Sequence, residues 1–377
     1  MRGKALGACL LASTLVFASG CAGGGRPDTP ASPSPPPPPP VAGELGRGNQ
    51  TAGSVDLVVE LEGDDLHRPT DLKFDPQSPR LWIVNQEGVQ KHGSWTIIED
   101  VEGVAPSVKR YVDDSPHFLH QPSSLSFHGD EKVVGTCQES HDDIQGGSRW
   151  MGPTAWTTDS RFSGGHMSHF DMLHESGYCM GIAWTADHVW WAFNGDRGSL
   201  DRNNFNGWHP DAPNGDGLGG HNHHDGNIYR YADGELKRSP GVPSGMSHDA
   251  ATHTLYVADT GNGRVVKIDT TPPQKGPRIQ GIWDEVPLYR VDGVDLAEVI
   301  PPGQLKQPSG LEFYKGHLYV ADYATGIIYA FTPEGEVVNQ LDTGLGAGHV
   351  TSLTMSESGH LHFLDTTGNR LYRIDPK

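Results

Sequence analysis

The sequence predicts an all-β fold, a six-bladed β-propeller closed by an N-terminal strand. A strand–turn–strand unit recurs along the chain, its strands alternate with a period of two, and one more strand-like segment precedes the first unit. In one strand, for example, Leu318 and Val320 alternate with Tyr319 and Ala321. A single small sheet of this kind leaves apolar surface exposed, whereas radial stacking of six sheets buries every face.

The clearest copies of the unit lie in the C-terminal half. Pro308-Ser-Gly-Leu311 precedes Leu318-Tyr-Val-Ala-Asp322, just as Pro243-Ser-Gly-Met246 precedes Leu255-Tyr-Val-Ala-Asp259. Looser copies keep the same order of segments in the N-terminal half. The six units begin at the equivalent positions Pro69, Pro122, Cys179, Pro243, Pro308 and Val350.

The last unit ends at Asp375 after its third strand, with almost no chain left for a fourth. Val55 to Leu61 alternates suitably and precedes the first unit. We therefore expect this segment to pair with the final unit, which closes the ring and hides two sheet edges.

The N-terminal segment has the features of an export signal. Residues 1–20 carry two early positive charges, a short apolar run and small residues at the end. Ala18-Ser19-Gly20-Cys21 resembles a lipobox, in which the cysteine thiol is lipidated and becomes the new N-terminus. This resemblance implies a lipoprotein anchored to the membrane through Cys21. Ala22 is not an acidic retention signal, so lipoprotein sorting by analogy implies the outer membrane. An ordinary signal cleaved nearby is the alternative.

Residues 21–54 are expected to form a disordered linker, because they are rich in Gly, Pro, Ser and Ala. The six prolines from Pro35 to Pro40 favour an extended stalk. Residues 55–377 are then the propeller, expected as a monomer.

The charge balance excludes one class of partner. The chain has 28 Lys and Arg against 47 Asp and Glu, a net charge of -19. Such acidity argues against nucleic acid as a ligand and against electrostatic adhesion to anionic lipid.

The succession Pro-Ser-Gly-Leu, Leu-Tyr-Val-Ala-Asp and Asn-Gly-Arg-Val resembles NHL repeats over about residues 55 to 377. The resemblance implies a propeller of the group that includes the peptidylglycine amidating lyase, gluconolactonase-type enzymes and non-enzymatic binding modules. The lyase carries Pro-His at the start of each innermost strand. Here the equivalent positions hold Thr70, Ser123, Met180, Ser244, Ser309 and Thr351, so its metal ligands do not carry over.

In a propeller, the connections between blades and those between second and third strands emerge on one face, which is the default site. The histidines expected there are His67, His117, His120, His141, His166, His169, His174 and His349. The acidic and amide residues expected there are Asp71, Glu139, Glu175, Asn194, Asp196, Asp259, Asn262, Asp322 and Asp365. For Asp259, Asp322 and Asp365 we favour structural turn-capping roles.

Two groups could hold a divalent metal, zinc or calcium, as the candidate cofactor. The rim group comprises His120, His166, His169, His174, Glu175 and His349. The alternative lies in the Gly-rich loop between Asn206 and Gly226, with His221, His223, His224 and Asp225 as its candidate ligands. The competing interpretations are histidines that only hydrogen-bond turns, and a solvated loop without metal.

Two cysteines remain in the expected propeller. Cys137 ends a second strand and Cys179 begins the innermost strand of the next unit, so both should emerge at the same face of neighbouring blades. We expect a disulfide, which an exported protein permits. The alternative is a free catalytic thiol paired with His174.

The sequence leaves two function classes open. The favoured one is a cell-envelope binding module for a peptide, glycan or protein partner. The other is a metal-dependent lyase or hydrolase acting on a small extracytoplasmic substrate at the central channel, with His120, His174, Glu175 and His349 as ligands or acid–base groups. The sequence contains no Gly-x-Ser-x-Gly, phosphate-loop, dinucleotide or His-Glu-x-x-His motif.

Overall fold

The computed structural model describes residues 42–46, 50–51, 55–87, 93–113, 119–141, 151–158, 169–207, 226–271, 276–281 and 286–377. The side chains of residues 50, 51, 169 and 170 are outside the description. The chain divides into two compact units, Met1–Pro40 and Val41–Lys377, and the second unit contains all of the described residues.

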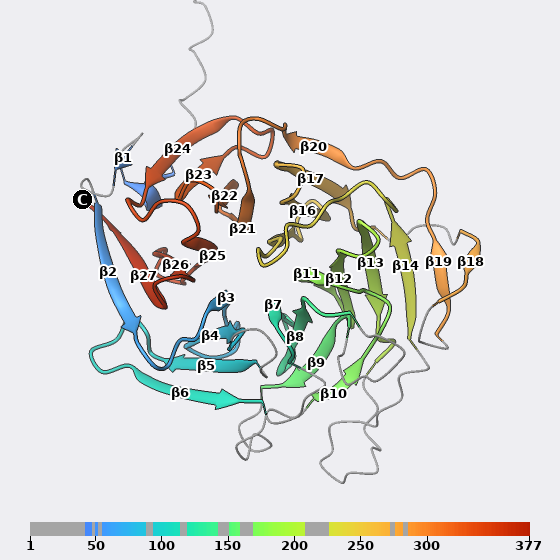
Figure 1. The fold of residues 1–377 in the computed structure, drawn as a ribbon, viewed down its shortest axis with the longest axis horizontal. Coiled ribbons are helices and arrows are strands. Elements are labelled where there is room, and N and C mark those ends of the chain that lie inside the picture. Colours follow the sequence, from blue (N-terminus) through green and yellow to red (C-terminus); the bar gives the residue numbers. More distant parts are fainter. Residues whose placement is uncertain are drawn as a thin grey trace, which may run out of the picture. The chain divides into compact units, whose positions relative to one another are not determined.

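Six sheets surround a common centre, so the predicted six-bladed propeller is confirmed (Figure 1). Each blade runs outward from an innermost strand, mainly by antiparallel pairing. Blade 1 contains β3 (Pro69–Phe74), β4 (Arg80–Asn85), β5 (Ser94–Glu99) and β6 (Ser107–Val112). Blade 2 contains β7 (Pro122–Phe127), β8 (Val133–Gln138), β9 (Thr154–Thr157) and β10 (His169–Met172). Blade 3 contains β11 (Cys179–Ala186), β12 (Val189–Asn194), β13 (Ser199–Asn204) and β14 (Asn227–Tyr231), with β19 (Leu288–Arg290) and β18 (Arg278–Ile279) added outside.

The remaining three blades are arranged in chain order. Blade 4 contains β15 (Met246–Asp249), β16 (Thr254–Asp259), β17 (Arg264–Asp269) and β20 (Ala297–Ile300). Blade 5 contains β21 (Pro308–Tyr314), β22 (His317–Asp322), β23 (Ile327–Phe331) and β24 (Val337–Asp342), with β1 (Gln50–Thr51) parallel to β24. Blade 6 contains β25 (Val350–Met355), β26 (Leu361–Asp365), β27 (Arg370–Pro376) and, as its outermost strand, β2 (Val55–Glu62).

The closing strand lies where the sequence predicts it. β2 pairs antiparallel with β27, with Val55 opposite Pro376 and Leu57 opposite Ile374. One blade is therefore built from both ends of the propeller (Figure 1), which leaves neither end as an open sheet edge.

The recurring Pro-Ser-Gly segment has a structural reason. Thr70 Oγ1 donates to the Pro122 carbonyl at 2.8 Å, and Ser309 Oγ donates to the Val350 carbonyl at 3.2 Å. Each hydroxyl thus links one innermost strand to the next. A Cβ at Gly310 would lie 2.5 Å from the Ser352 Cα, so only glycine fits where the strands approach.

Blade 4 begins its innermost strand later than expected, at Met246 rather than Pro243. The reason is a backbone bond to the next blade, since Gly245 N donates to the Ser309 carbonyl at 2.7 Å. Gly245 therefore directs its N–H away from its own sheet.

Charged side chains also join the innermost strands. Asp71, expected on the rim, is instead buried in the channel wall, where its carboxylate accepts hydrogen bonds from Ser124 of blade 2 and Ser352 of blade 6. Lys73 of blade 1 pairs with Glu312 of blade 5. Since blade 6 lies between these blades, this ion pair crosses the central channel.

Cys137 of β8 and Cys179 of β11 form a disulfide, with their Cα atoms 5.2 Å apart. The expected pairing is therefore confirmed, and the free-thiol alternative is wrong. Because the cysteines belong to blades 2 and 3, the bond links neighbouring sheets covalently.

Part of the segment expected to be a linker packs on the propeller. The 3₁₀ turn η1 (Gly43–Leu45) buries Leu45 in the apolar core shared by blades 5 and 6. Asn339 Nδ2 donates to the Ala42 carbonyl at 2.7 Å, and the Tyr319 hydroxyl donates to Glu44 at 2.6 Å. In the described part of the chain, no helix is long and apolar enough to cross a membrane.

Candidate functional site

A pocket of about 410 Å³ opens where blades 1, 5 and 6 meet on the face that carries the connections between blades. We call this face the connection face and this cavity the rim pocket. It is lined by His67, Arg68, Glu87, Tyr323, Thr366, Thr367 and Asn369. These residues come from the β2–β3, β4–β5, β22–β23 and β26–β27 connections. The position agrees with the face predicted from the sequence, although only His67 was among the predicted site residues.

Three lining residues have a left-handed backbone: Arg68 (φ 51°), Glu87 (φ 55°) and Asn369 (φ 50°). Asn369 occupies the turn position that Gly263 and Gly326 occupy in blades 4 and 5. Such conformations cost free energy and persist only where the surroundings hold them, often at ligand sites. Three positions in the wall of the rim pocket are therefore strained.

Hydrogen bonds fix the strained residues in place. The Arg68 N–H donates to Asn369 Oδ1 at 2.7 Å, and the Arg68 carbonyl accepts from Gln86 N at 3.2 Å. Gln121 and Tyr178 precede the innermost strands of blades 2 and 3 and are also left-handed. The left-handed conformation is thus shared by the residues that precede the innermost strands of blades 1, 2 and 3. Blade 1 differs in having an arginine side chain at this position.

The one carboxylate in the lining of the rim pocket, that of Glu87, already has a basic partner. Glu87 pairs with Arg110 and accepts a hydrogen bond from Ser94. His67 Nε2 lies 2.8 Å from the Asp64 carbonyl, so this nitrogen is a donor, and His67 Nδ1 is 3.9 Å from Glu87. The Glu87 carboxylate is thus held as part of the wall.

A second polar cluster lies on the connection face between blades 2, 3 and 4. Glu139 accepts from Arg238 at 2.6 Å and from Gly241 N at 2.9 Å. Burial raises the pKa of Glu139, against the lowering effect of Gly241 and Arg238. The Arg238 guanidinium lies 4.0 Å from the centre of the Tyr178 ring, a cation–π contact.

His349 is bonded to a buried carboxylate on the same face. Its Nδ1 lies 2.7 Å from Asp365 Oδ1, and Asp365 is 2% exposed. If Nδ1 carries the proton, Nε2 is left as an acceptor, which is the arrangement of a general base or a metal ligand. Asp365 also accepts from Gly368 N at 2.7 Å, so it caps its turn as expected.

Glu175 and Asn194 belong to a buried ion-pair network in blade 3. Arg230 Nε lies 2.8 Å from Asp201 Oδ1, and both side chains are almost completely buried. Arg230 also donates to the Glu175 carbonyl at 3.1 Å, and Asn194 Nδ2 donates to Asp201 at 2.8 Å. The network holds the connection before β11 against the sheet.

The other rim candidates do not form one cluster in the described chain. His169 lies on β10, the outermost strand of blade 2, rather than on a connection. His120 is buried, whereas His174 and His349 are half-buried. Seven of the predicted site residues lie outside the described residues: Cys21, His117, His166, His221, His223, His224 and Asp225.

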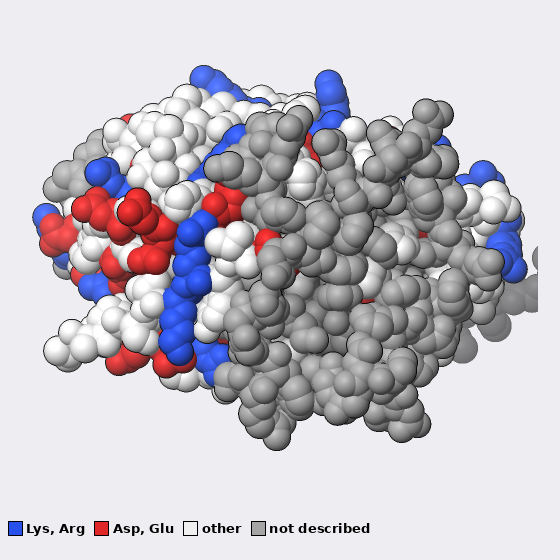
Figure 2. Space-filling view, turned by 60° about the horizontal axis from the view of Figure 1, so that its bottom comes forward, with Lys and Arg blue, Asp and Glu red and all other residues white. Residues whose placement is uncertain are grey.

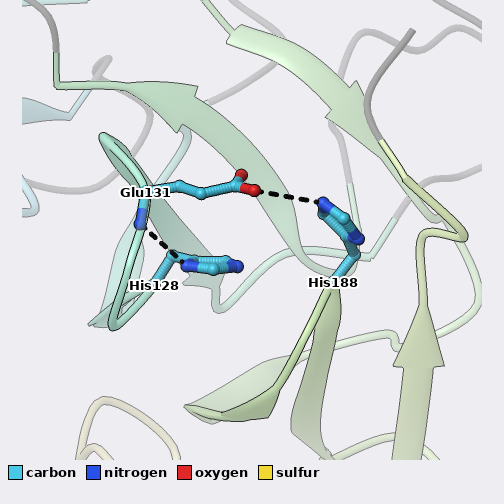
Figure 3. Close-up of side chains that lie close together, drawn as sticks. All are labelled: His128, Glu131 and His188. Carbon is cyan, nitrogen blue, oxygen red and sulfur yellow. Dashed lines mark hydrogen bonds and ion pairs between the residues drawn. The ribbon is translucent and has the colours of Figure 1, made fainter.

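One group of metal-ligand type is found among the described residues, and it was not predicted from the sequence. His128, Glu131 and His188 each offer a ligand atom, all within 4.8 Å of one another. His128 and Glu131 lie in the β7–β8 turn and His188 lies in the β11–β12 turn (Figure 3). Equivalent turns of adjacent blades are neighbours, which is the signal that could have identified the group.

The hydrogen bonds of His128 argue against metal ligation by this residue. Its Nδ1 accepts from Asp130 N at 3.1 Å and from Glu131 N at 3.0 Å (Figure 3 shows the second bond). Neutral imidazole then carries its proton on Nε2, which becomes a donor. Burial lowers the pKa of His128, and the nearby His188 lowers it further. His128 is therefore best described as a neutral residue that caps its turn, with His188 paired to Glu131 at 3.5 Å.

Acidic and basic side chains lie beside one another on the described part of the surface in Figure 2.

No protein-family model matches the chain, and no curated protein matches it. Its fold is similar to solved propellers. An auxiliary nutrient binding protein from Bacteroides ovatus is 12% identical with a TM-score of 0.52, over 88% of this chain and 78% of that one. One from Bacteroides thetaiotaomicron is 15% identical with a TM-score of 0.51, over 82% and 69%. A catalytically inactive virginiamycin B lyase from Staphylococcus aureus, with quinupristin, is 12% identical with a TM-score of 0.50, over 85% and 88%. At these identities the likeness establishes the propeller fold alone.

Proposed function

We propose that this chain is an exported lipoprotein of the cell envelope whose propeller binds a polar ligand at the rim pocket. The observation that carries the proposal is a pocket on the connection face whose wall contains the exposed Arg68 side chain beside the polar side chains of Tyr323 and Asn369. The name of the two Bacteroides relatives in fold, nutrient binding proteins, supports a binding role.

The anchor is part of the same proposal. The lipobox-like Ala18-Ser19-Gly20-Cys21 supports lipidation at Cys21 and an outer-membrane location. Labelling cells with a fatty-acid analogue tests it: the wild-type chain should incorporate label and sediment with membranes, and Cys21→Ser should do neither. Equal labelling of both proteins would contradict lipidation at this cysteine.

Ligand binding is tested by screening the full chain against glycan and peptide arrays, then obstructing the pocket. Thr367 is exposed at its mouth, so Thr367→Trp should abolish binding of the ligand found. Thr252→Trp, in an exposed β15–β16 turn, is the matched control and should bind normally. Retained binding by Thr367→Trp would exclude the rim pocket as the site.

A second candidate is a lyase or hydrolase, and the bond between His349 and Asp365 is the observation that favours it. Elemental analysis separates the two classes. A stoichiometric metal that is lost in His174→Ala and His349→Ala variants supports the metal-dependent enzyme. Turnover without metal that depends on His349 supports a metal-free version, and a stable metal-free binder without turnover supports the first proposal.

A further inference from the structure

The donors and acceptors of the rim pocket are unequally distributed. Asn369 Oδ1 is used by the Arg68 N–H, which leaves the Asn369 amide NH₂ as a donor. The Tyr323 hydroxyl and the Arg68 guanidinium add further donors to the lining. Glu87, the one carboxylate in the lining, is paired with Arg110. The Thr367 hydroxyl donates to the Gly348 carbonyl at 2.7 Å and is left as an acceptor, whereas the Arg68 guanidinium and the Asn369 NH₂ are left as donors.

Among the described residues, Arg68 forms no close ion pair. Among the described residues, no carboxylate lies within 4.0 Å of its guanidinium, whereas Arg110, Arg230 and Arg238 each have one. Glu139 is influenced by the charge of Arg68 but is hydrogen-bonded to Arg238 and Gly241. In a chain of net charge -19, an exposed arginine that has no ion pair with a described carboxylate and lies beside a pocket favours an anionic ligand.

The position of the guanidinium suits a ligand in the centre of the connection face. A Cβ at Gly241 would lie 3.3 Å from Arg68 Nη2, so the side chain extends from blade 1 toward the connection that leads into blade 4. The left-handed backbone and its two hydrogen bonds fix where this side chain starts. Such preorganisation reduces the entropic cost of binding.

The lining also limits the chemical class of the ligand. It contains hydroxyl, amide, imidazole and guanidinium groups and one aromatic ring, that of Tyr323, but no aliphatic side chain. Apolar peptide side chains would find no matching surface there, whereas a hydroxylated ligand could use the donors and lie on the ring. A guanidinium binds a carboxylate with two parallel hydrogen bonds.

We propose that the rim pocket binds an acidic saccharide, with the Arg68 guanidinium receiving the carboxylate of a uronate residue and Asn369 and Tyr323 contacting its hydroxyls. This inference rests on the proposed function, because it names the ligand class of the same pocket.

Isothermal titration of the full chain with trigalacturonate and with neutral galactotriose tests the inference. Trigalacturonate should bind at least tenfold more tightly. Arg68→Gln should weaken trigalacturonate binding by about 10- to 100-fold, the usual effect of a lost charged hydrogen bond, and remove the preference over galactotriose. Arg197→Gln is the matched control, because Arg197 is exposed on the same face but outside the pocket. It should bind within twofold of wild type.

The outcomes separate this inference from the proposed function. Binding that Thr367→Trp abolishes but Arg68→Gln leaves unchanged would overturn the anionic subsite and retain the pocket. Selective binding of acidic peptides over trigalacturonate would overturn the saccharide class. Binding that survives Thr367→Trp would overturn the proposed function itself.

Discussion

His362 of β26 and Glu60 of β2 lie 2.7 Å apart, although the closing strand and the last blade are at opposite ends of the propeller sequence. The other ring nitrogen, His362 Nε2, lies 2.9 Å from Glu102 in the β5–β6 turn of blade 1. His362 is fully buried. With an acceptor on each nitrogen, the ring is held as an imidazolium that joins the closing strand, blade 6 and blade 1.

The stability of the propeller should therefore depend on pH. Burial alone would lower the pKa of His362, but hydrogen bonds to Glu102 and Glu60 raise it above its ordinary value. The hydrogen bond from His362 holds the pKa of Glu102 far below its usual range. A raised histidine pKa gives stability that is complete below about pH 6.5 and is lost as pH rises through the folded pKa. A lowered carboxyl pKa gives stability that is present above about pH 4.3 and is lost on acidification.

Urea unfolding of wild type and His362→Gln across pH measures this effect. The variant should be less stable by about 3 kcal/mol near pH 5.5, because Glu60 keeps a buried charge with fewer partners. The difference should shrink toward pH 9. A difference independent of pH would mean that His362 is not the titrating group.

The buried pair Asp201–Arg230 predicts an asymmetric response to substitution. Arg230→Met leaves Asp201 charged and buried, so it should cost about 3–5 kcal/mol of unfolding free energy. Replacing both residues with apolar ones of similar size should cost clearly less. Calorimetry of the single and double variants measures both losses of unfolding free energy. Equal losses in the two variants would contradict the explanation that the unpaired charge of Asp201 causes the instability.

The disulfide between blades 2 and 3 should contribute to stability. Its cysteines are 42 residues apart, and the Cys137→Ser/Cys179→Ser double variant should lose about 2–5 kcal/mol. Denaturant unfolding under oxidising and reducing conditions measures the stability of both proteins. Reduced wild type should be about as stable as the double variant. Stability unaffected by reduction would contradict this role.

The close approach of innermost strands predicts intolerance at Gly310. Gly310→Ala places a Cβ 2.5 Å from the Ser352 backbone, so we expect a loss of at least about 2 kcal/mol from strain. Gly43→Ala, where no atom lies within 4 Å, is the control and should be close to neutral. Thermal unfolding of the two variants compares them directly.

Much of the fold could be predicted because the repeat is a local signal. Five of the six predicted starting positions are the first residues of innermost strands, and only blade 4 begins later than predicted. These five positions are Pro69, Pro122, Cys179, Pro308 and Val350. The pairing of β2 with β27 and the Cys137–Cys179 bond could be predicted from the same register. Local alternation fixes strands, and the need for closure fixes their arrangement.

The site could be predicted only as a face of the molecule. Arg68, Tyr323 and Asn369 are far apart in sequence, and no local pattern shows that three different blades place them around one pocket. Residue type alone makes a histidine a candidate metal ligand, whereas the bond of His349 to Asp365 and the turn-capping role of His128 are contacts of the folded chain. These roles depend on hydrogen bonds that a sequence does not display.

The central claim, that ligand enters the rim pocket between blades 1, 5 and 6, is tested most directly by hydrogen exchange. Amides of the full chain should be compared with and without trigalacturonate at saturation. We predict slower exchange in the peptides that contain Arg68, Glu87 and Thr366 to Asn369, and no change at the β7–β8 turn of His128 to Glu131. Protection confined to that turn, or to any peptides outside the rim pocket, would contradict the account.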